Sequence, residues 1–368
     1  MTDQPNSSYD SSDAGRALAE AIQSVFAVEG ITTGARNERT IHLQGKLLTD
    51  SESAYEHIAS RFETLGYTPI IREDGGAATV TALPGVFATS STRDRGAVIL
   101  FGLTVVSMLF AAGAAQAPDL DWLLRNPLAG LPFAASLLAI LAAHEMGHYW
   151  MSRRLGIAAS LPYFIPMPLS LFGTMGAIMR TRSPMRNRKQ VLAVGAAGPI
   201  AGLVLAIPIL IFGLLRSQVQ PIPMQEGLLV EGNSLLYLGL KYLIFGQILP
   251  RNGMDVFLDP VAFAAWAGLL LTSLNLIPAG QLDGGHIAYA LLGRRARWLN
   301  RLAIAATAAL GLVWNGWFIW TALLFVFGQR NAEPLDDITP LSSKEKALAI
   351  GLLLMFVLLF TPVPMSIS

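Results

Sequence analysis

The chain has 368 residues, of which 53% are hydrophobic and only 14% are charged. Because a soluble globular protein carries about 25% charged residues, this composition predicts an integral membrane protein. The formal net charge of +1 gives no basic surface for nucleic acid, and the absence of cysteine excludes disulfides and thiolate metal ligands. Any bound metal must therefore be held by His, Asp or Glu.

The N-terminal part of the chain differs from the rest in having a higher density of charged residues. Residues 1–15 are polar and acidic, which predicts a disordered tail and not a signal peptide. Residues 16–92 predict a small soluble α/β domain. Its expected elements are helices over 15–28 and 51–65, and strands over 40–47, 67–71 and 77–83.

Residues 93–368 predict a transmembrane domain. The apolar candidate spans are 97–115, 131–150, 191–215, 260–277, 302–327 and 347–360, with weaker candidates at 235–248 and 288–292. Residues 302–327 are too long for one simple span, so we interpret them as a tight hairpin centred on Trp314 to Trp317, with one tilted helix as the alternative. The expected fold class is an α-helical polytopic membrane protein of about six to eight transmembrane helices, preceded by the small soluble domain.

The distribution of Lys and Arg predicts the orientation of these spans. Basic residues precede the first span and follow the second and the fourth, whereas residues 217–259 are sparsely charged. By the positive-inside rule, the N-terminal domain and the basic loops are expected on the cytosolic side.

A His-Glu-x-x-His motif lies inside the apolar stretch 131–150. On a helix, His144 and His148 share a face and can bind one metal ion, with Glu145 beside them as a general base. Charged residues at membrane depth cost roughly 2.5–3.5 kcal/mol each on insertion scales, which favours a functional site. The alternatives are a chance match, or histidines that only hydrogen-bond across a helix bundle.

A third ligand is needed, because catalytic zinc usually has three protein ligands and one open position. The best candidate is Asp283, at the end of the later apolar span. Pro278 breaks that helix, and the glycines around Asp283 permit a tight backbone. Irregular backbone at membrane depth occurs only inside protein or around a wet cavity. The alternative is a loop carboxylate at the membrane surface.

Together these motifs resemble the site-2 protease family of intramembrane zinc metalloproteases. HExxH lies on one span and NxxPxxxLDGG, from Asn275 to Gly285, on a later one. Residues 172–177 resemble the family's G-T/S-x-G-A segment, and residues 195–202 its GxxGPxAG helix start. The resemblance covers about residues 94–292, with the catalytic core at about 131–292, and is nearest to the plant plastid and bacterial branch without a PDZ domain.

The resemblance implies the roles of individual residues. One Zn²⁺ per chain would be bound by His144, His148 and Asp283, Glu145 would activate water, and Asn275 would orient the substrate or stabilise the oxyanion. The residues expected to bind substrate are Gly173, Thr174, Met175, Gly176 and Ala177. They lie in a Pro- and Gly-rich segment that is expected to offer a strand edge to an extended peptide, or else to act as a simple re-entrant connector. His286 is expected to support the site and not to be a fourth ligand.

The sequence therefore predicts an intramembrane zinc metalloprotease that hydrolyses transmembrane protein substrates within the lipid bilayer and does not bind nucleic acid. The expected location is the bacterial plasma membrane, with the N-terminal domain in the cytosol. One alternative is a catalytically silent relative that binds or chaperones membrane proteins. A transporter is a further alternative, but the chain lacks the paired repeats and the charges in several spans that would indicate one.

Overall fold

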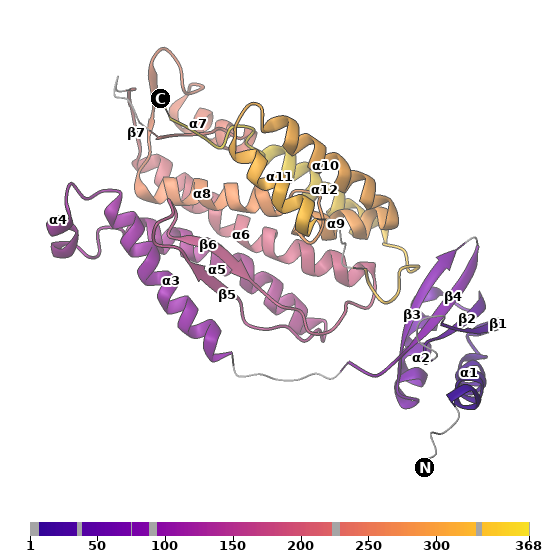
Figure 1. The fold of residues 1–368 in the computed structure, drawn as a ribbon. Helices are drawn as coiled ribbons and strands as arrows, with labels where there is room; N and C mark the ends of the chain where they lie inside the picture. Colours follow the sequence, from indigo (N-terminus) through magenta and orange to yellow (C-terminus); the bar gives the residue numbers. More distant parts are fainter. Residues whose placement is uncertain are drawn as a thin grey trace. The chain divides into compact units, whose positions relative to one another are not determined.

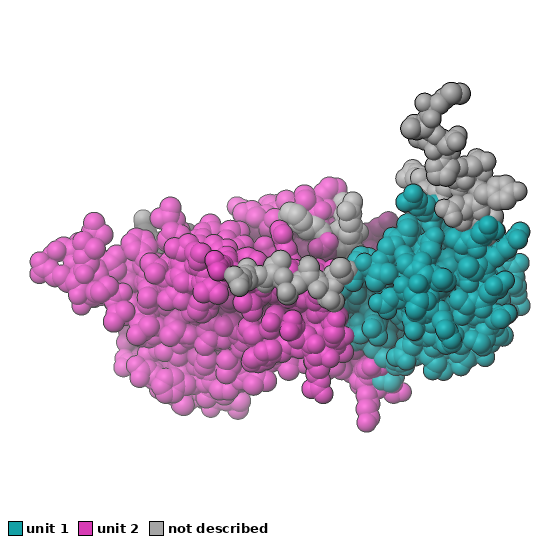
Figure 2. All heavy atoms as spheres, turned by 90° about the horizontal axis from the view of Figure 1, so that it is seen from below, with its two compact units in different colours: residues 1–90, 183–191, 333–342 teal, residues 91–182, 192–332, 343–368 magenta. Residues whose placement is uncertain are grey.

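The structure is a computed structural model that describes residues 7–34, 39–74, 76–87, 94–222, 229–328 and 333–367. The chain divides into two compact units, which Figure 2 colours separately. The N-terminal unit comprises residues 1–90, 183–191 and 333–342, and the helical unit comprises residues 91–182, 192–332 and 343–368. Two short segments, one from the middle of the chain and one from near its end, thus belong to the N-terminal unit.

The N-terminal unit packs two helices on an antiparallel sheet of four strands in the order β1-β2-β4-β3. Its elements are α1 (Ser7–Ile22), β1 (Phe26–Thr33), β2 (Ile41–Leu47), α2 (Ser51–Thr64), β3 (Tyr67–Asp74) and β4 (Ala77–Pro84). Asp50 caps α2 by accepting a hydrogen bond from the Ser53 backbone N–H at 3.0 Å. Ile22, Ile58 and Val80 are fully buried between the helices and the sheet. Alternation along the strands and 3.6-residue periodicity along the helices thus build one core.

The first helix differs from the expected one at both ends. α1 begins at Ser7, within the predicted tail, whose residues 1–6 lie outside the described residues. It ends at Ile22, and the helix expected to reach Val28 is wrong there because β1 begins at Phe26. The β-branched residues of β1 favour a strand, and its pairing with β2 buries Phe26 in the core. The tertiary partner therefore decides the conformation of this segment.

Residues 333–342 bond to the outer edge of β3, and residues 183–191 bond to residues 333–342 in turn. The Ile71 backbone N–H donates to the Leu335 carbonyl at 2.8 Å, and the Asp337 N–H donates to the Ile71 carbonyl at 3.2 Å. The Leu335 N–H in turn donates to the Met185 carbonyl at 3.0 Å. These bonds satisfy the β3 edge, which would otherwise expose unpaired backbone groups.

Asp336 is the buried polar group of this arrangement. Its side chain is 1% exposed. Its Oδ1 accepts the backbone N–H groups of Ile338 at 3.0 Å and Thr339 at 3.1 Å, whereas Oδ2 has no hydrogen-bond partner among the described residues. Burial raises the pKa of Asp336 above its ordinary value. The carboxyl group therefore fixes the turn that follows it while one of its oxygens stays unsatisfied.

The helical unit contains most of the remaining elements (Figure 1). Its helices are α3 (Arg95–Ala114), α4 (Leu120–Arg125), α5 (Leu131–Arg154), α6 (Arg188–Arg216, whose first turn is grouped with the N-terminal unit), α7 (Leu235–Phe245), α8 (Pro260–Asn275), α9 (Asp283–Leu292), a 3-10 turn at Gly293–Arg295, α10 (Ala296–Leu310), α11 (Gly316–Phe327) and α12 (Ser343–Leu359). Within the described ranges, two helices, α3 and α6, are long and apolar enough to cross a membrane, judged by length and composition. The chain is thus mostly helical, and the number of spans stays a prediction.

Three two-stranded sheets accompany these helices. They pair β5 (Tyr163–Pro166) with β6 (Thr174–Ile178), β7 (Gln218–Pro221) with β9 (Met254–Phe257), and β8 (Leu229–Glu231) with β10 (Met365–Ile367). The last two sheets were not expected, because their strands are three or four residues long and pair across long stretches of sequence. The hairpin interpretation of residues 302–327 is confirmed, since α10 and α11 are separate helices packed on each other.

Candidate metal centre

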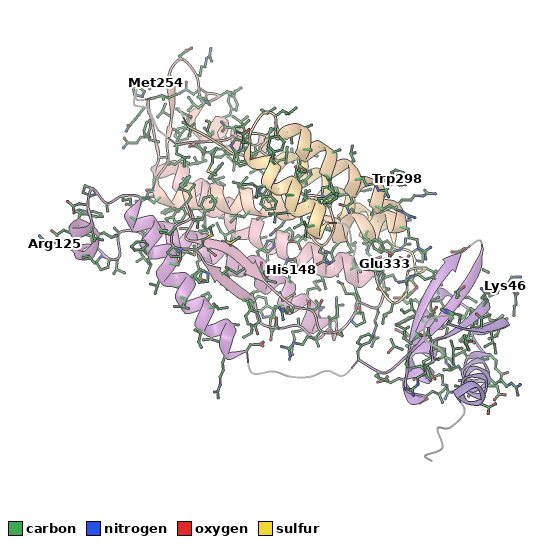
Figure 3. All side chains as sticks on the ribbon, viewed as in Figure 1. Lys46, Arg125, His148, Met254, Trp298 and Glu333 are labelled. Carbon is green, nitrogen blue, oxygen red and sulfur yellow. The ribbon has the colours of Figure 1, made fainter. Side chains whose placement is uncertain are left out.

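Helix α5 carries the His-Glu-x-x-His motif on a buried face. His144, Glu145 and His148 are all buried, and Figure 3 labels His148 within the helical unit. The spacing of one helical turn brings the two imidazoles together, with their Nε2 atoms 3.2 Å apart. The helix therefore presents two nitrogen donors at one point.

Asp283 completes this group from the first position of α9. Its Oδ2 lies 3.1 Å from His144 Nε2, and its Oδ1 lies 3.2 Å from His148 Nε2. One ligand atom from each of the three residues lies within 4.8 Å of the others. Local sequence explains the placement, because α8 ends at Asn275 and the chain turns through irregular backbone before α9 begins.

The glycines around Asp283 make this turn possible. Gly280 has a φ of +56°, a left-handed conformation that favours glycine. A Cβ atom on Gly284 would collide with the Leu276 carbonyl, so the backbone passes too close for any side chain. The turn that holds the carboxylate against the histidines therefore requires glycine at positions 280 and 284.

Helix α6 orients His148 through a backbone carbonyl. His148 Nδ1 donates to the Val194 carbonyl at 2.8 Å. Because a carbonyl only accepts, Nδ1 carries the proton and Nε2 keeps its lone pair free for a metal. No sequence pattern predicts this contact, because any residue type supplies the same backbone carbonyl.

Glycines on α6 allow that close approach. A Cβ atom on Gly198 would collide with the His148 ring, and one on Gly202 would lie 3.3 Å from His144 Nδ1. On α5, a Cβ atom on Gly147 would lie 2.5 Å from the Ala197 carbonyl oxygen. The motif from Gly195 to Gly202 is therefore the packing surface that receives the histidines, in line with the general role of small residues between membrane helices.

The donor set fits zinc. Two imidazole nitrogens and one carboxylate oxygen are common ligands of catalytic zinc, and three protein ligands leave one position for water. Glu145 is not a member of the ligand group. Because it follows His144 directly in the chain, its carboxylate lies beside the ligand group. The arrangement has the parts of a site that activates water.

Two further polar residues lie near the ligands. Asn275 Nδ2 lies 3.5 Å from His144 Nε2, so the end of α8 reaches the site. His286 Nδ1 donates to the Leu282 carbonyl at 2.9 Å, and His286 does not belong to the ligand group. His286 thus stabilises the first turn of α9, whereas Asn275 faces the candidate metal.

The segment expected to bind substrate forms the β5–β6 hairpin. Gly173 and Gly176 have φ values of +71° and +91°, Thr174 is buried, Met175 is 67% exposed, and Ala177 pairs with Phe164. Ser107 of α3 donates to the Gly173 carbonyl at 2.6 Å and anchors the hairpin. Strand β5 packs against α3 and strand β6 against α5. The described residues add no third strand to this sheet, and β6 also packs against α3.

The fold and the site together are typical of a metallopeptidase. The two histidines of a helical HExxH motif are joined by an aspartate that begins a later helix, α9. The model of peptidase family M50 matches residues 132–314. The chain therefore carries a peptidase family M50 domain, and its resemblance to the site-2 protease family is confirmed.

The curated relatives agree with this family. The protein named probable zinc metalloprotease EGY2, chloroplastic, of Arabidopsis thaliana is 34% identical over 293 residues, which cover 78% of this chain and 51% of that protein. EGY1 of the same plant, also named a probable chloroplastic zinc metalloprotease, is 30% identical over 268 residues, covering 70% of this chain and 48% of that protein. The chain thus spans about half the length of these relatives. No solved structure matches the chain.

The relatives also correct the expected location. The prediction of a bacterial plasma membrane is wrong, because the matched EGY proteins are chloroplast proteins of plants and point to a plastid membrane. The sequence motifs are shared by the plastid and bacterial branches, so motifs alone did not separate the two compartments.

Proposed function

We propose that this protein is an intramembrane zinc metalloprotease that cleaves peptide bonds within or near transmembrane segments of membrane proteins. The observation that carries the proposal is the meeting of His144, His148 and Asp283 within 4.8 Å, beside the buried Glu145. The names of the relatives, probable zinc metalloproteases, support a protease role.

The chain's own residues divide the work of hydrolysis. His144, His148 and Asp283 would hold one zinc ion, which when bound lowers the pKa of water and polarises a carbonyl group. The Glu145 carboxylate takes a proton from the attacking water and delivers it to the leaving amide nitrogen. The Asn275 side-chain amide, 3.5 Å from His144 Nε2, donates a hydrogen bond to the substrate carbonyl oxygen as negative charge develops there.

The substrate must be extended where it is cut, because the peptide bonds of an intact helix are hydrogen-bonded and shielded. The edge of β6, which packs against α5, supports binding of an extended peptide by strand addition. Gly173, Thr174, Met175, Gly176 and Ala177 would then contact the substrate backbone and its flanking side chains.

The setting we propose is a plastid membrane, with about six to eight spans and with the N-terminal unit on the same side as the basic loops. The apolar composition and the helices α3 and α6 support insertion into a lipid bilayer. The proposed partners are transmembrane substrates and lipid, and no nucleic acid.

Glu145→Gln tests the proposal, because the amide keeps the size of the side chain and removes the base. We expect cleavage of a single-span substrate in liposomes to fall by about 10²–10⁴-fold, with zinc content unchanged on the same samples. Near-normal cleavage by this variant would refute the mechanism. A wild-type protein that binds zinc but cleaves no member of a broad panel of membrane substrates would instead favour a silent relative that binds or chaperones membrane proteins.

A further inference from the structure

A cavity of about 290 Å³ lies in the helical unit apart from the metal ligands. Its walls come from the end of α3, the start of α5, the loop between β5 and β6, strand β8, and strand β9 with the start of α8. Strand β9 begins at Met254, which Figure 3 labels and which directly precedes Asp255 of the cavity wall. The walls are largely apolar and include Ala115, Phe133, Leu171 and Phe263. The volume lies at the lower end of the range of small-molecule sites, about 300 Å³, and it is large enough for one large side chain.

Two carboxylates interrupt the apolar wall. Glu231 and Asp255 line the cavity and are held by Lys241, which is fully buried. Lys241 Nζ lies 3.0 Å from Asp255 Oδ1 and 3.8 Å from Glu231 Oε1, and the Tyr237 hydroxyl donates to the same Glu231 oxygen at 3.0 Å. Two acidic groups and one ammonium leave a formal excess of negative charge, which attracts a cation near the cavity.

Helix α5 contributes both to the cavity and to the candidate metal centre. Phe133 and His144 are on the same helix, α5, so they are separated by about 16 Å at 1.5 Å per residue. Leu171 belongs to the loop that leads into β6. An extended peptide on the β6 edge covers that distance with about five residues at 3.3 Å each. The β5–β6 loop therefore reaches the cavity, and β6 packs on the helix that carries the histidines.

We propose that this cavity binds a large apolar side chain of the substrate, next to a basic residue, about five residues from the scissile bond. The proposal rests on the proposed function and extends it by naming the substrate feature that is recognised. The apolar wall accepts the side chain, and the carboxylates of Glu231 and Asp255 attract the neighbouring cation.

Photo-cross-linking tests the proposal without cleavage. A single-span substrate would carry benzoylphenylalanine at one position at a time, up to seven residues on either side of the bond cut by the wild type. Each peptide would be bound to the Glu145→Gln protein in liposomes and irradiated, and the cross-linked residues would be identified by mass spectrometry. We expect cross-links to Phe133, Leu171 or Phe263 from the fourth to sixth position on one side. If the wild type cuts none of the peptides, the probe is moved through the whole span.

Two matched substitutions at the end of α3 provide the control. Ala115 is exposed and lines the cavity, whereas its exposed neighbour Ala114 does not. Ala115→Trp should fill the opening and weaken binding of a substrate with Leu at the identified position by about ten- to hundredfold, the effect of burying one such side chain. It should not change binding of a substrate with Gly there, and Ala114→Trp should change neither. Glu231→Gln should reduce the preference for Lys over Glu next to that position.

The outcomes separate this proposal from the proposed function. Cross-links that avoid the cavity, or equal binding by Ala115→Trp and Ala114→Trp, would overturn the cavity assignment even if the protein cleaves its substrates. Cross-links in the cavity, with no cleavage by the wild type of any member of the broad panel of membrane substrates, would support the binding site and count against the protease assignment.

Discussion

Gly198→Ala is expected to remove zinc although it replaces none of the three metal ligands. The added Cβ atom would lie 2.5 Å from His148 Cδ2 and Cε1. Carbon atoms pack best at about 3.5–4.0 Å, so the ring or the helix must move by about 1 Å. Metal–ligand distances tolerate only about 0.2 Å, so His148 Nε2 would leave its position.

The loss of zinc affinity should be large. Removing a supporting partner of a metal ligand typically costs about 10–100-fold in affinity, and displacing the ligand itself should cost at least the upper end, about 3 kcal/mol. Alanine favours a helix over glycine by up to about 1 kcal/mol, so loss of zinc would not reflect a weaker α6.

Two further Gly→Ala substitutions grade the effect. At Gly202 the new Cβ atom would lie 3.3 Å from His144, which requires a shift of a few tenths of an ångström, and at Gly102 it would meet nothing within 4 Å. Chelator competition on the purified proteins in detergent should therefore rank zinc affinity as Gly102→Ala, then Gly202→Ala, then Gly198→Ala. If Gly198→Ala binds zinc as tightly as Gly102→Ala, the packing of α6 on His148 described above is wrong.

Three other predictions concern the ligand aspartate, the topology and the N-terminal unit. Asp283→Asn should lower zinc occupancy and cleavage together, in contrast to Glu145→Gln, and metal analysis of the same samples checks this. In sealed vesicles, single cysteines at the exposed positions Arg186 and Gln218 should react with an impermeant maleimide from opposite sides, and labelling from the same side contradicts the orientation. Because burial raises the pKa of Asp336 above 3.8, its contribution to stability is present below that pH and is lost as the pH rises through the raised value. Asp336→Asn should abolish this loss of stability with rising pH. Hydrogen exchange of the β3 amides in the full chain, corrected for intrinsic exchange rates, measures it. If the variant and the wild type have the same pH profile, the assigned role of Asp336 is wrong.

The sequence by itself determined the parts that depend on local spacing. One helical turn between His144 and His148 predicts a shared face, and Pro278 with its neighbouring glycines predicts a break that frees Asp283. Both follow from chain geometry over a few residues, and the structure brings these three side chains together. Likewise, Trp314 to Trp317 marked the end of one helix and the start of the next.

Tertiary structure alone decided what depends on partners distant in the chain. Phe26 begins a strand and not the end of a helix because β2 pairs with it. Residues 333–342 join the N-terminal unit because the edge of β3 offers unpaired backbone groups. The tautomer of His148 is set by the Val194 carbonyl, and the glycines of α6 matter because two helices meet there. Backbone groups and close packing act through space and leave no periodicity in the sequence, so only the folded chain shows them.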